Sequence, residues 1–197
     1  MGVGRFSYSP LIPALIEAGH LSAAQAGSVG ASNFFGYLVG TLVAPSLRGR
    51  WGEANSLRLC LVVALVCLVA SILPWGFLWL AFWRFLVGGC IGVMMIYALA
   101  IVTRAAPPEK LGAATGIVFT GVGVAILMVA TLVPMLLREG IAAAWSGLAV
   151  VGGAGVAVAF WGWRATGPDA GLAAAGRPKA AIKWTPVVVG LVGARTM

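Results

Sequence analysis

The run from Gly76 to Val102 reads GFLWLAFWRFLVGGCIGVMMIYALAIV, and Arg84 is its only charged residue. A helix needs roughly 20 apolar residues to cross about 30 Å of hydrocarbon, so this run is long enough to span a bilayer. Arginine keeps its charge at physiological pH, and a charge at membrane depth indicates a functional position by default. The run therefore predicts a spanning helix with a functional arginine inside it.

The remaining composition indicates the same setting for the whole chain. Of its 197 residues, 61% are hydrophobic and only 9% are charged, and the mean hydropathy is +1.02. This balance leaves no room for a soluble domain and predicts an all-α membrane protein with six transmembrane helices. The predicted spans are Met1–Glu17, Ala26–Leu47, Leu57–Trp75, Gly76–Val102, Gly112–Leu137 and Ala142–Trp163. A further stretch, Thr185–Met197, reaches only about 20 Å as a helix and is predicted to be a truncated seventh helix.

The formal charge of +8 follows the predicted loops and does not form a patch of the kind that binds nucleic acid. Loops predicted on the side of the amino terminus carry nine basic residues, and the opposite loops carry only Arg138. The nine are Arg48, Arg50, Arg58, Arg104, Lys110, Arg164, Arg177, Lys179 and Lys183. By the positive-inside rule, loops 48–56, 104–111 and 164–184 are predicted to be cytoplasmic.

Two arginines are predicted to lie near the middle of the bilayer. The first span lacks a hydrophobic lead-in, and Arg5 falls about 18 Å below its outer end, at a depth similar to that of Arg84. Two interpretations stay open: the arginines clamp a carboxylate or another anion, or they bond to carbonyls and hydroxyls and lock two helices together. Tyr8, one turn from Arg5, and Tyr97 are predicted either to line the same cavity or to pack.

Small and polar residues recur at helical spacing. In the second span, Asn33, Tyr37 and Thr41 form one stripe, which is either a hydrogen-bonding seam between helices or the wall of a watered cavity. Glycines at such spacing let neighbouring backbones approach closely. The residues predicted to pack helices in this way are Gly36, Gly40, Gly88, Gly92, Gly112, Gly116, Gly121 and Gly123.

The predicted spans fall into two groups of three, followed by a linker. Residues 164–184 are the least apolar part of the chain and are predicted to join two bundles. The predicted domains are a six-helix bundle over 1–163, a cytoplasmic linker over 164–184 and the truncated helix over 185–197. Arg5 and Arg84 each precede a phenylalanine in the first span of their group. An inverted repeat would place matching residues at these two positions.

Three strings resemble the amino-terminal half of a major facilitator superfamily (MFS) transporter, most closely its bacterial YbfB/YjiJ branch. They are GRFSYSPLIP at 4–13, ASNFFGYLVG at 31–40 and GIVFTGVG at 116–123. Arg84, Gly88 and Gly92 are similar to the superfamily's fourth-helix motif, an arginine followed by glycines at four-residue steps. The resemblance covers about residues 1–163. It implies an MFS-type 3+3 inverted-repeat bundle in a bacterial inner membrane, with substrate bound between two such bundles.

The family has twelve spanning helices, and residues 189–195 do not resemble its seventh. The chain is therefore predicted to be a fragment of a secondary active transporter that moves a small solute by alternating access, an anion if the arginines bind it. The alternative is a non-transporting truncated membrane protein or a partner subunit, and a carboxy-terminal half or a second copy is the corresponding partner. The residues predicted to line the substrate pathway are Arg5, Tyr8, Asn33, Tyr37, Arg84 and Tyr97.

An intramembrane enzyme is a distant third reading. His20 is the only histidine of the sequence, and the serines inside the spans have no base within sequence reach. The five acidic residues are predicted to lie at helix ends or in loops, with no carboxylate buried. Cys60, Cys67 and Cys90 show no metal-site spacing and are predicted to be packing residues. The sequence thus predicts no catalytic residue, no metal site and no cofactor.

Overall fold

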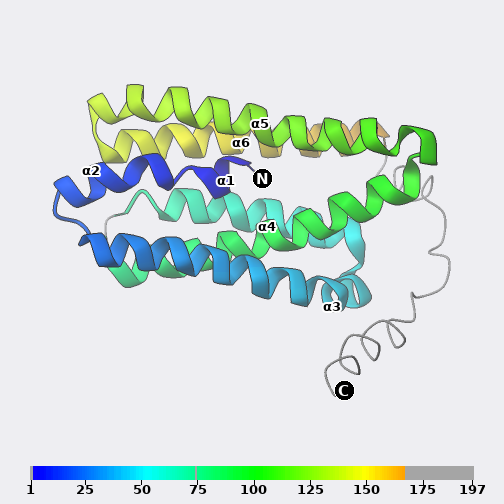
Figure 1. Cartoon of the computed structure of the whole chain (residues 1–197), viewed down its shortest axis with the longest axis horizontal. Helices are drawn as coiled ribbons and strands as arrows, with labels where there is room; N and C mark the ends of the chain where they lie inside the picture. The colour runs from blue at the N-terminus through cyan, green and yellow to red at the C-terminus, as the bar shows by residue number, and fades with distance from the viewer. Residues whose placement is uncertain (1, 74, 167–197) are drawn as a thin grey trace, which may run out of the picture.

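The computed structural model describes residues 2–73 and 75–166, and every element within them is a helix (Figure 1). Four of these helices are long and apolar enough to cross a membrane: α3 (Ala23–Ala70), α4 (Phe77–Ala105), α5 (Leu111–Leu136) and α6 (Ile141–Thr166). The predicted class, an all-helical membrane protein, is therefore confirmed. Most of the predicted linker and the stretch 185–197 lie outside the described residues.

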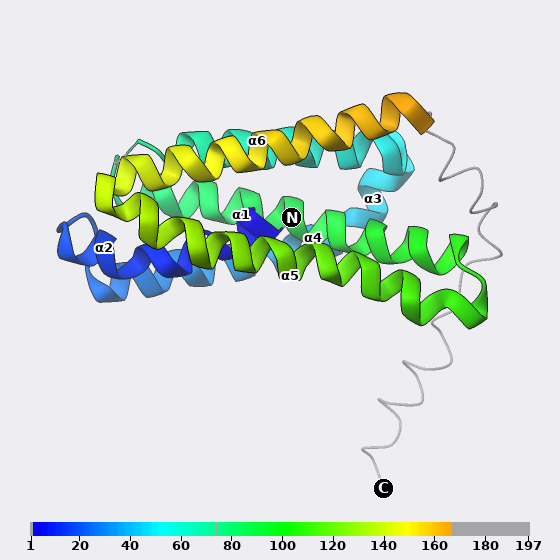
Figure 2. The ribbon, with the colours of Figure 1, turned by 90° about the horizontal axis from the view of Figure 1, so that it is seen from above.

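The predicted first span is not one continuous helix. It consists of α1 (Gly2–Phe6), the short 3₁₀ helix η1 (Ser9–Leu11) and α2 (Ile12–Glu17). Pro10 and Pro13 each lack a backbone N–H, and their rings disturb the turn before them, so two prolines this close together interrupt the helix and a new one starts with Pro13 in its first turn. The expectation of a single helix over Met1–Glu17 was wrong for this reason. In both ribbon views α1 lies about midway along the molecule (Figures 1 and 2).

Helix α3 contains a reversal of the chain at a single residue, Gly52. Its start is fixed by a capping box, in which Ser22 and Gln25 each accept a backbone N–H from the other. Gly52 has φ +77°, a conformation that L side chains rarely adopt, and the chain turns back there (Figures 1 and 2). The residues on either side are helical. The predicted loop 48–56 is therefore corrected to two helical arms, 23–51 and 53–70, joined at one glycine.

The first arm of α3 and helix α4 touch through their backbones. A Cβ added at Gly36 or Gly40 would overlap the carbonyls of Phe85 and Gly89, and one at Gly88 or Gly92 would overlap carbonyls of the α3 arm. Only glycine permits this approach. The predicted packing glycines of α5 behave differently, because a Cβ at Gly112, Gly116, Gly121 or Gly123 would meet no described atom within 4 Å.

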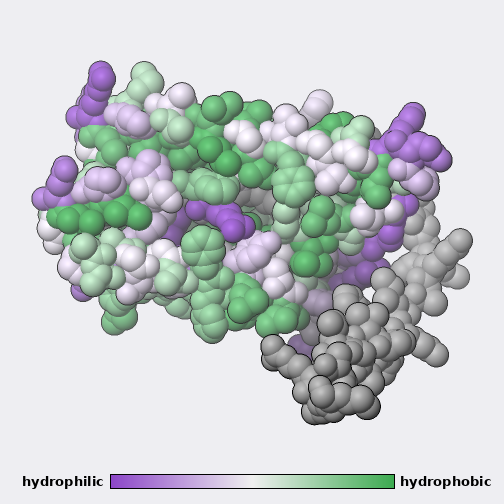
Figure 3. All heavy atoms as spheres, in the orientation of Figure 1, coloured by the Kyte–Doolittle hydropathy of each residue, from purple (hydrophilic) through white to green (hydrophobic). Residues whose placement is uncertain are grey.

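The described buried side chains form two hydrophobic clusters. One centres on Leu11, Val29 and Trp145 and joins η1 and α2 to the beginnings of α3 and α6. The other lies between α3 and α4 and includes Cys60 and Cys67. On the surface, hydrophobic side chains cover most of the face seen in Figure 3, while hydrophilic ones gather mainly at the two ends. This arrangement suits a protein whose middle is surrounded by lipid.

Candidate functional site

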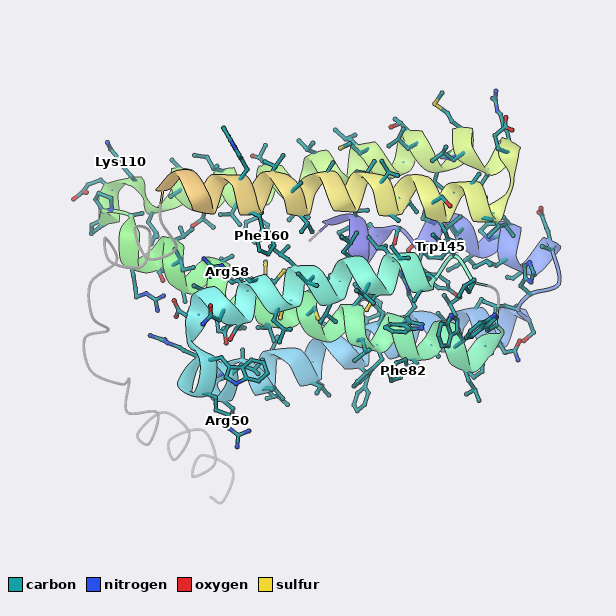
Figure 4. The ribbon with its side chains drawn as sticks, turned by 180° about the vertical axis from the view of Figure 1, so that it is seen from behind. Arg50, Arg58, Phe82, Lys110, Trp145 and Phe160 are labelled. Atoms are coloured by element: carbon teal, nitrogen blue, oxygen red, sulfur yellow. The ribbon has the colours of Figure 1, made fainter. Side chains whose placement is uncertain are left out.

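Arg84 of α4 is completely buried and bonded to three other parts of the chain. Its Nη1 donates to the Gly4 carbonyl and to Ser7 Oγ, both at 3.2 Å, and its Nη2 donates to Ser71 Oγ at 3.4 Å. Its guanidinium carbon lies 4.9 Å from the ring centroid of Trp145, the α6 residue labelled in Figure 4. Every one of these contacts is to a neutral group. Arg84 therefore links α4 to three other parts of the chain. These are α1 with the segment that follows it, the end of α3, and α6.

Tyr8 and Asn33 belong to the same buried group. The ring of Tyr8 lies 5.9 Å from the Arg84 guanidinium, and its hydroxyl donates to the Ala26 carbonyl at 3.0 Å. Asn33 Nδ2 donates to the Arg84 carbonyl at 2.9 Å. The structure thus brings three of the six predicted pathway residues together, and each of them donates at least one side-chain hydrogen bond to protein. Arg84 Nε is buried and has no hydrogen-bond partner among the described residues.

Arg5 of α1 has a different environment from Arg84. Its guanidinium carbon lies 4.6 Å from the ring centroid of Tyr37, 5.6 Å from that of Phe34 and 5.9 Å from that of Phe6. The side chain is half-buried, and within residues 2–73 and 75–166 it has no hydrogen bond to protein and no carboxylate partner. In Figure 3 a hydrophilic spot lies in the middle of the mostly hydrophobic face, near α1. Arg5 is the only charged residue of α1.

Tyr97 lies apart from both arginines. Its hydroxyl donates to the Ala44 carbonyl at 2.7 Å, and it packs in the second hydrophobic cluster. Of the other predicted pathway residues, Tyr37 is the one whose ring contacts the Arg5 guanidinium. The structure therefore divides the predicted set into Arg84 with Tyr8 and Asn33, Arg5 with Tyr37, and Tyr97 by itself.

The sequence-based expectation that no carboxylate is buried was wrong for Glu53. This residue is 7% exposed and forms ion pairs with Arg104 and with Arg48, whose Nε lies 3.1 Å from Oε1. Glu53 directly follows Gly52, so the reversal of the chain turns its side chain toward the end of α4. A single acid among the basic residues of this region was the signal that could have identified the ion pair.

Glu53→Ala is expected to lower the free energy of unfolding by about 2 kcal/mol. The substitution leaves Arg104 partly buried without a carboxylate partner, which is destabilising. The loss of the second ion pair costs less, because Arg48 is partly solvated. Equilibrium unfolding in mixed detergent micelles measures the difference. Glu17→Ala, at an exposed position of α2, is the matched control. Equal stabilities of the two variants would contradict a structural role for the ion pairs.

Comparison with known proteins identifies the family of the chain. No curated protein and no solved structure matches the chain. A family model described as "Uncharacterised MFS-type transporter YbfB" matches residues 1–194. The match extends beyond residue 163, where the resemblance was expected to end, and takes in nearly the whole sequence. The chain therefore belongs to the YbfB-type family of MFS transporters.

Proposed function

We propose that the chain forms one bundle of a secondary transporter and that Arg5 binds its anionic solute. The observation that supports this most directly is the guanidinium of Arg5, half-buried near the middle of the bundle with no carboxylate partner among the described residues. An unpaired charge at membrane depth is costly unless a ligand or water reaches it. A solute carboxylate would supply the missing charge through paired hydrogen bonds.

Arg84 has a positioning role in this proposal. Its Nη donors are used by Gly4, Ser7 and Ser71, and its side chain is inaccessible. By holding Gly4, it fixes the backbone immediately before Arg5. Tyr8 and Asn33 support Arg84, Tyr37 supports Arg5, and we assign Tyr97 to packing between α3 and α4.

The proposed architecture is an MFS-type bundle of six spanning segments in a 3+3 inverted repeat over residues 1–163. Its six segments are residues 1–17, the two arms of α3, and helices α4, α5 and α6. The reversal at Gly52 supports counting α3 twice. The basic residues support a bacterial inner-membrane orientation with 48–56, 104–111 and the linker 164–184 in the cytoplasm. Alternating access is then the motion of this bundle against another.

The open glycine face of α5 supports a second bundle as the partner. A Cβ added at Gly116 or Gly123, which lie seven residues apart on one side of α5, would meet no described atom within 4 Å. Such small-residue faces allow close helix contact in membranes. In this proposal a carboxy-terminal half or a second copy packs there and closes the solute site.

Arg5→Gln is expected to reduce solute-induced charge movement about tenfold or more, because the amide cannot neutralise a carboxylate. The full chain in proteoliposomes is exposed to a panel of acetate, benzoate, isophthalate, phosphate and sulfate on a solid-supported membrane, and the transient currents are recorded. Arg138→Gln, at an exposed position, is the matched control and should leave the currents unchanged. Arg5→Lys should retain part of the response.

Two results would contradict the proposal. Currents of equal size in the Arg5→Gln protein would place the solute elsewhere. A folded wild-type protein that responds to none of the anions would instead favour a non-transporting membrane protein.

A further inference from the structure

The way Arg5 stacks on its neighbours leaves a particular part of the guanidinium for a ligand. The rings of Tyr37, Phe34 and Phe6 surround the guanidinium carbon at 4.6, 5.6 and 5.9 Å. Contact of this kind uses the π faces of the rings and does not consume the N–H donors of arginine. The donors of Arg5 therefore stay free for one carboxylate, which accepts two of them in parallel.

The number of positive charges at this depth limits the charge of the ligand. Arg84 is the other arginine of the inner part of the bundle, and it is enclosed and bonded to Gly4, Ser7 and Ser71. The site thus offers one accessible positive charge. A second carboxylate on the ligand would lie at membrane depth without a partner, which is strongly unfavourable. A neutral ligand would leave Arg5 itself unneutralised.

The surface around the charge is apolar and aromatic. Phe34 is 61% exposed beside Arg5, so its ring offers surface for contact with a ligand. The rings of Tyr37 and Phe6 lie on the same guanidinium, so the described neighbours of the charge are aromatic. Aromatic surface of this kind favours a flat apolar group attached to the carboxylate.

We propose that the Arg5 site selects monocarboxylates with an apolar, planar body over small, doubly charged or neutral solutes. This inference rests on the proposed function and specifies its substrate class. Benzoate is the simplest probe with the required features. Acetate lacks the apolar body, isophthalate adds a second charge, and benzamide removes the charge while keeping the ring.

The test is a ligand-observed NMR titration of the full chain in lipid nanodiscs with these four probes. Empty nanodiscs provide the background of partition into lipid. Benzoate is expected to bind about tenfold more tightly than each of the other three, and Arg5→Gln should weaken benzoate binding about tenfold. Phe34→Leu should weaken benzoate binding about threefold more than it weakens acetate binding.

Phe82→Leu is the matched control for the ring. Phe82 is 54% exposed on α4 and points away from the bundle in Figure 4. This variant should bind all probes like the wild-type protein. Repeating the titration in nanodiscs that contain an anionic phospholipid distinguishes a soluble acid from a lipid. Unchanged benzoate affinity supports a soluble solute, and its loss identifies a lipid as the occupant and overturns the proposal.

The failure of this inference can be distinguished from the failure of the proposed function. If acetate or isophthalate binds as tightly as benzoate and this binding depends on Arg5, the selectivity is wrong while the anion site stands. If no probe binds in an Arg5-dependent manner, both proposals are overturned.

Discussion

Arg84→Ala is expected to lower the free energy of unfolding by about 3 kcal/mol, measured by equilibrium unfolding in mixed detergent micelles. The substitution opens a cavity at a position of zero exposure and leaves the Gly4 carbonyl without its donor, two effects that each cost on the order of 1–3 kcal/mol. Removing a desolvated charge offsets part of this loss. The net effect is large because Arg84 contacts α1, α3 and α6 at once.

Arg50→Ala is the matched control, because Arg50 is exposed on α3 and extends away from the bundle in Figure 4. Its stability should equal that of the wild-type protein. Arg84→Lys keeps the charge but loses the planar fork, and we expect it to be less stable than wild type. Normal stability of Arg84→Lys together with a strong loss of anion response would contradict the positioning role and make Arg84 a ligand of the solute.

Gly40→Ala is expected to have a comparable effect, a loss of about 3 kcal/mol in the same unfolding assay. The added methyl group would overlap the backbone of Gly89 on α4. Backbone atoms cannot rotate away as a side-chain end can, so the two helices must separate and lose contacts along their shared face. Gly36→Ala, which would overlap the Phe85 carbonyl, should behave in the same way.

Gly27→Ala controls for the intrinsic preference of alanine for helices. It lies on the same helix, and an added Cβ there would meet no described atom within 4 Å. We expect this variant to be as stable as wild type or more stable by up to about 1 kcal/mol. Destabilisation of Gly27→Ala to the same degree as Gly40→Ala would show that the close approach of α3 and α4 is not the cause.

The positions of α4, α5 and α6 could be predicted closely because long apolar runs have one stable solution in a bilayer. The predicted span Gly112–Leu137 compares with α5 at Leu111–Leu136. A reversal between the second and third spans was predicted, but its tightness was not, because a glycine among polar residues indicates a turn and not one that is completed in a single residue. The same reversal buries Glu53, so both errors have one cause.

The two arginines illustrate what a sequence contains about a membrane site. Counting residues along a helix predicts the depth of Arg84, because the rise per residue is fixed. The same count is less direct for Arg5, because η1 interrupts the helix between it and Glu17. It does not give the direction in which each side chain points, which depends on how neighbouring helices are rotated. The contacts of Arg84 with Ser71 and Trp145 arise from residues far apart in sequence. Its enclosure, and the openness of Arg5, became apparent only from the packed structure.

The turn at Gly52 also has a consequence for how the protein is made. Arms 23–51 and 53–70 are joined at Gly52 with no loop between them, so they form one helical hairpin. The first arm includes Arg48 and Arg50 near its end, which favour retention of the turn on the side of synthesis. We therefore expect the insertion machinery to receive the two arms together, as a helical hairpin released into lipid in one step.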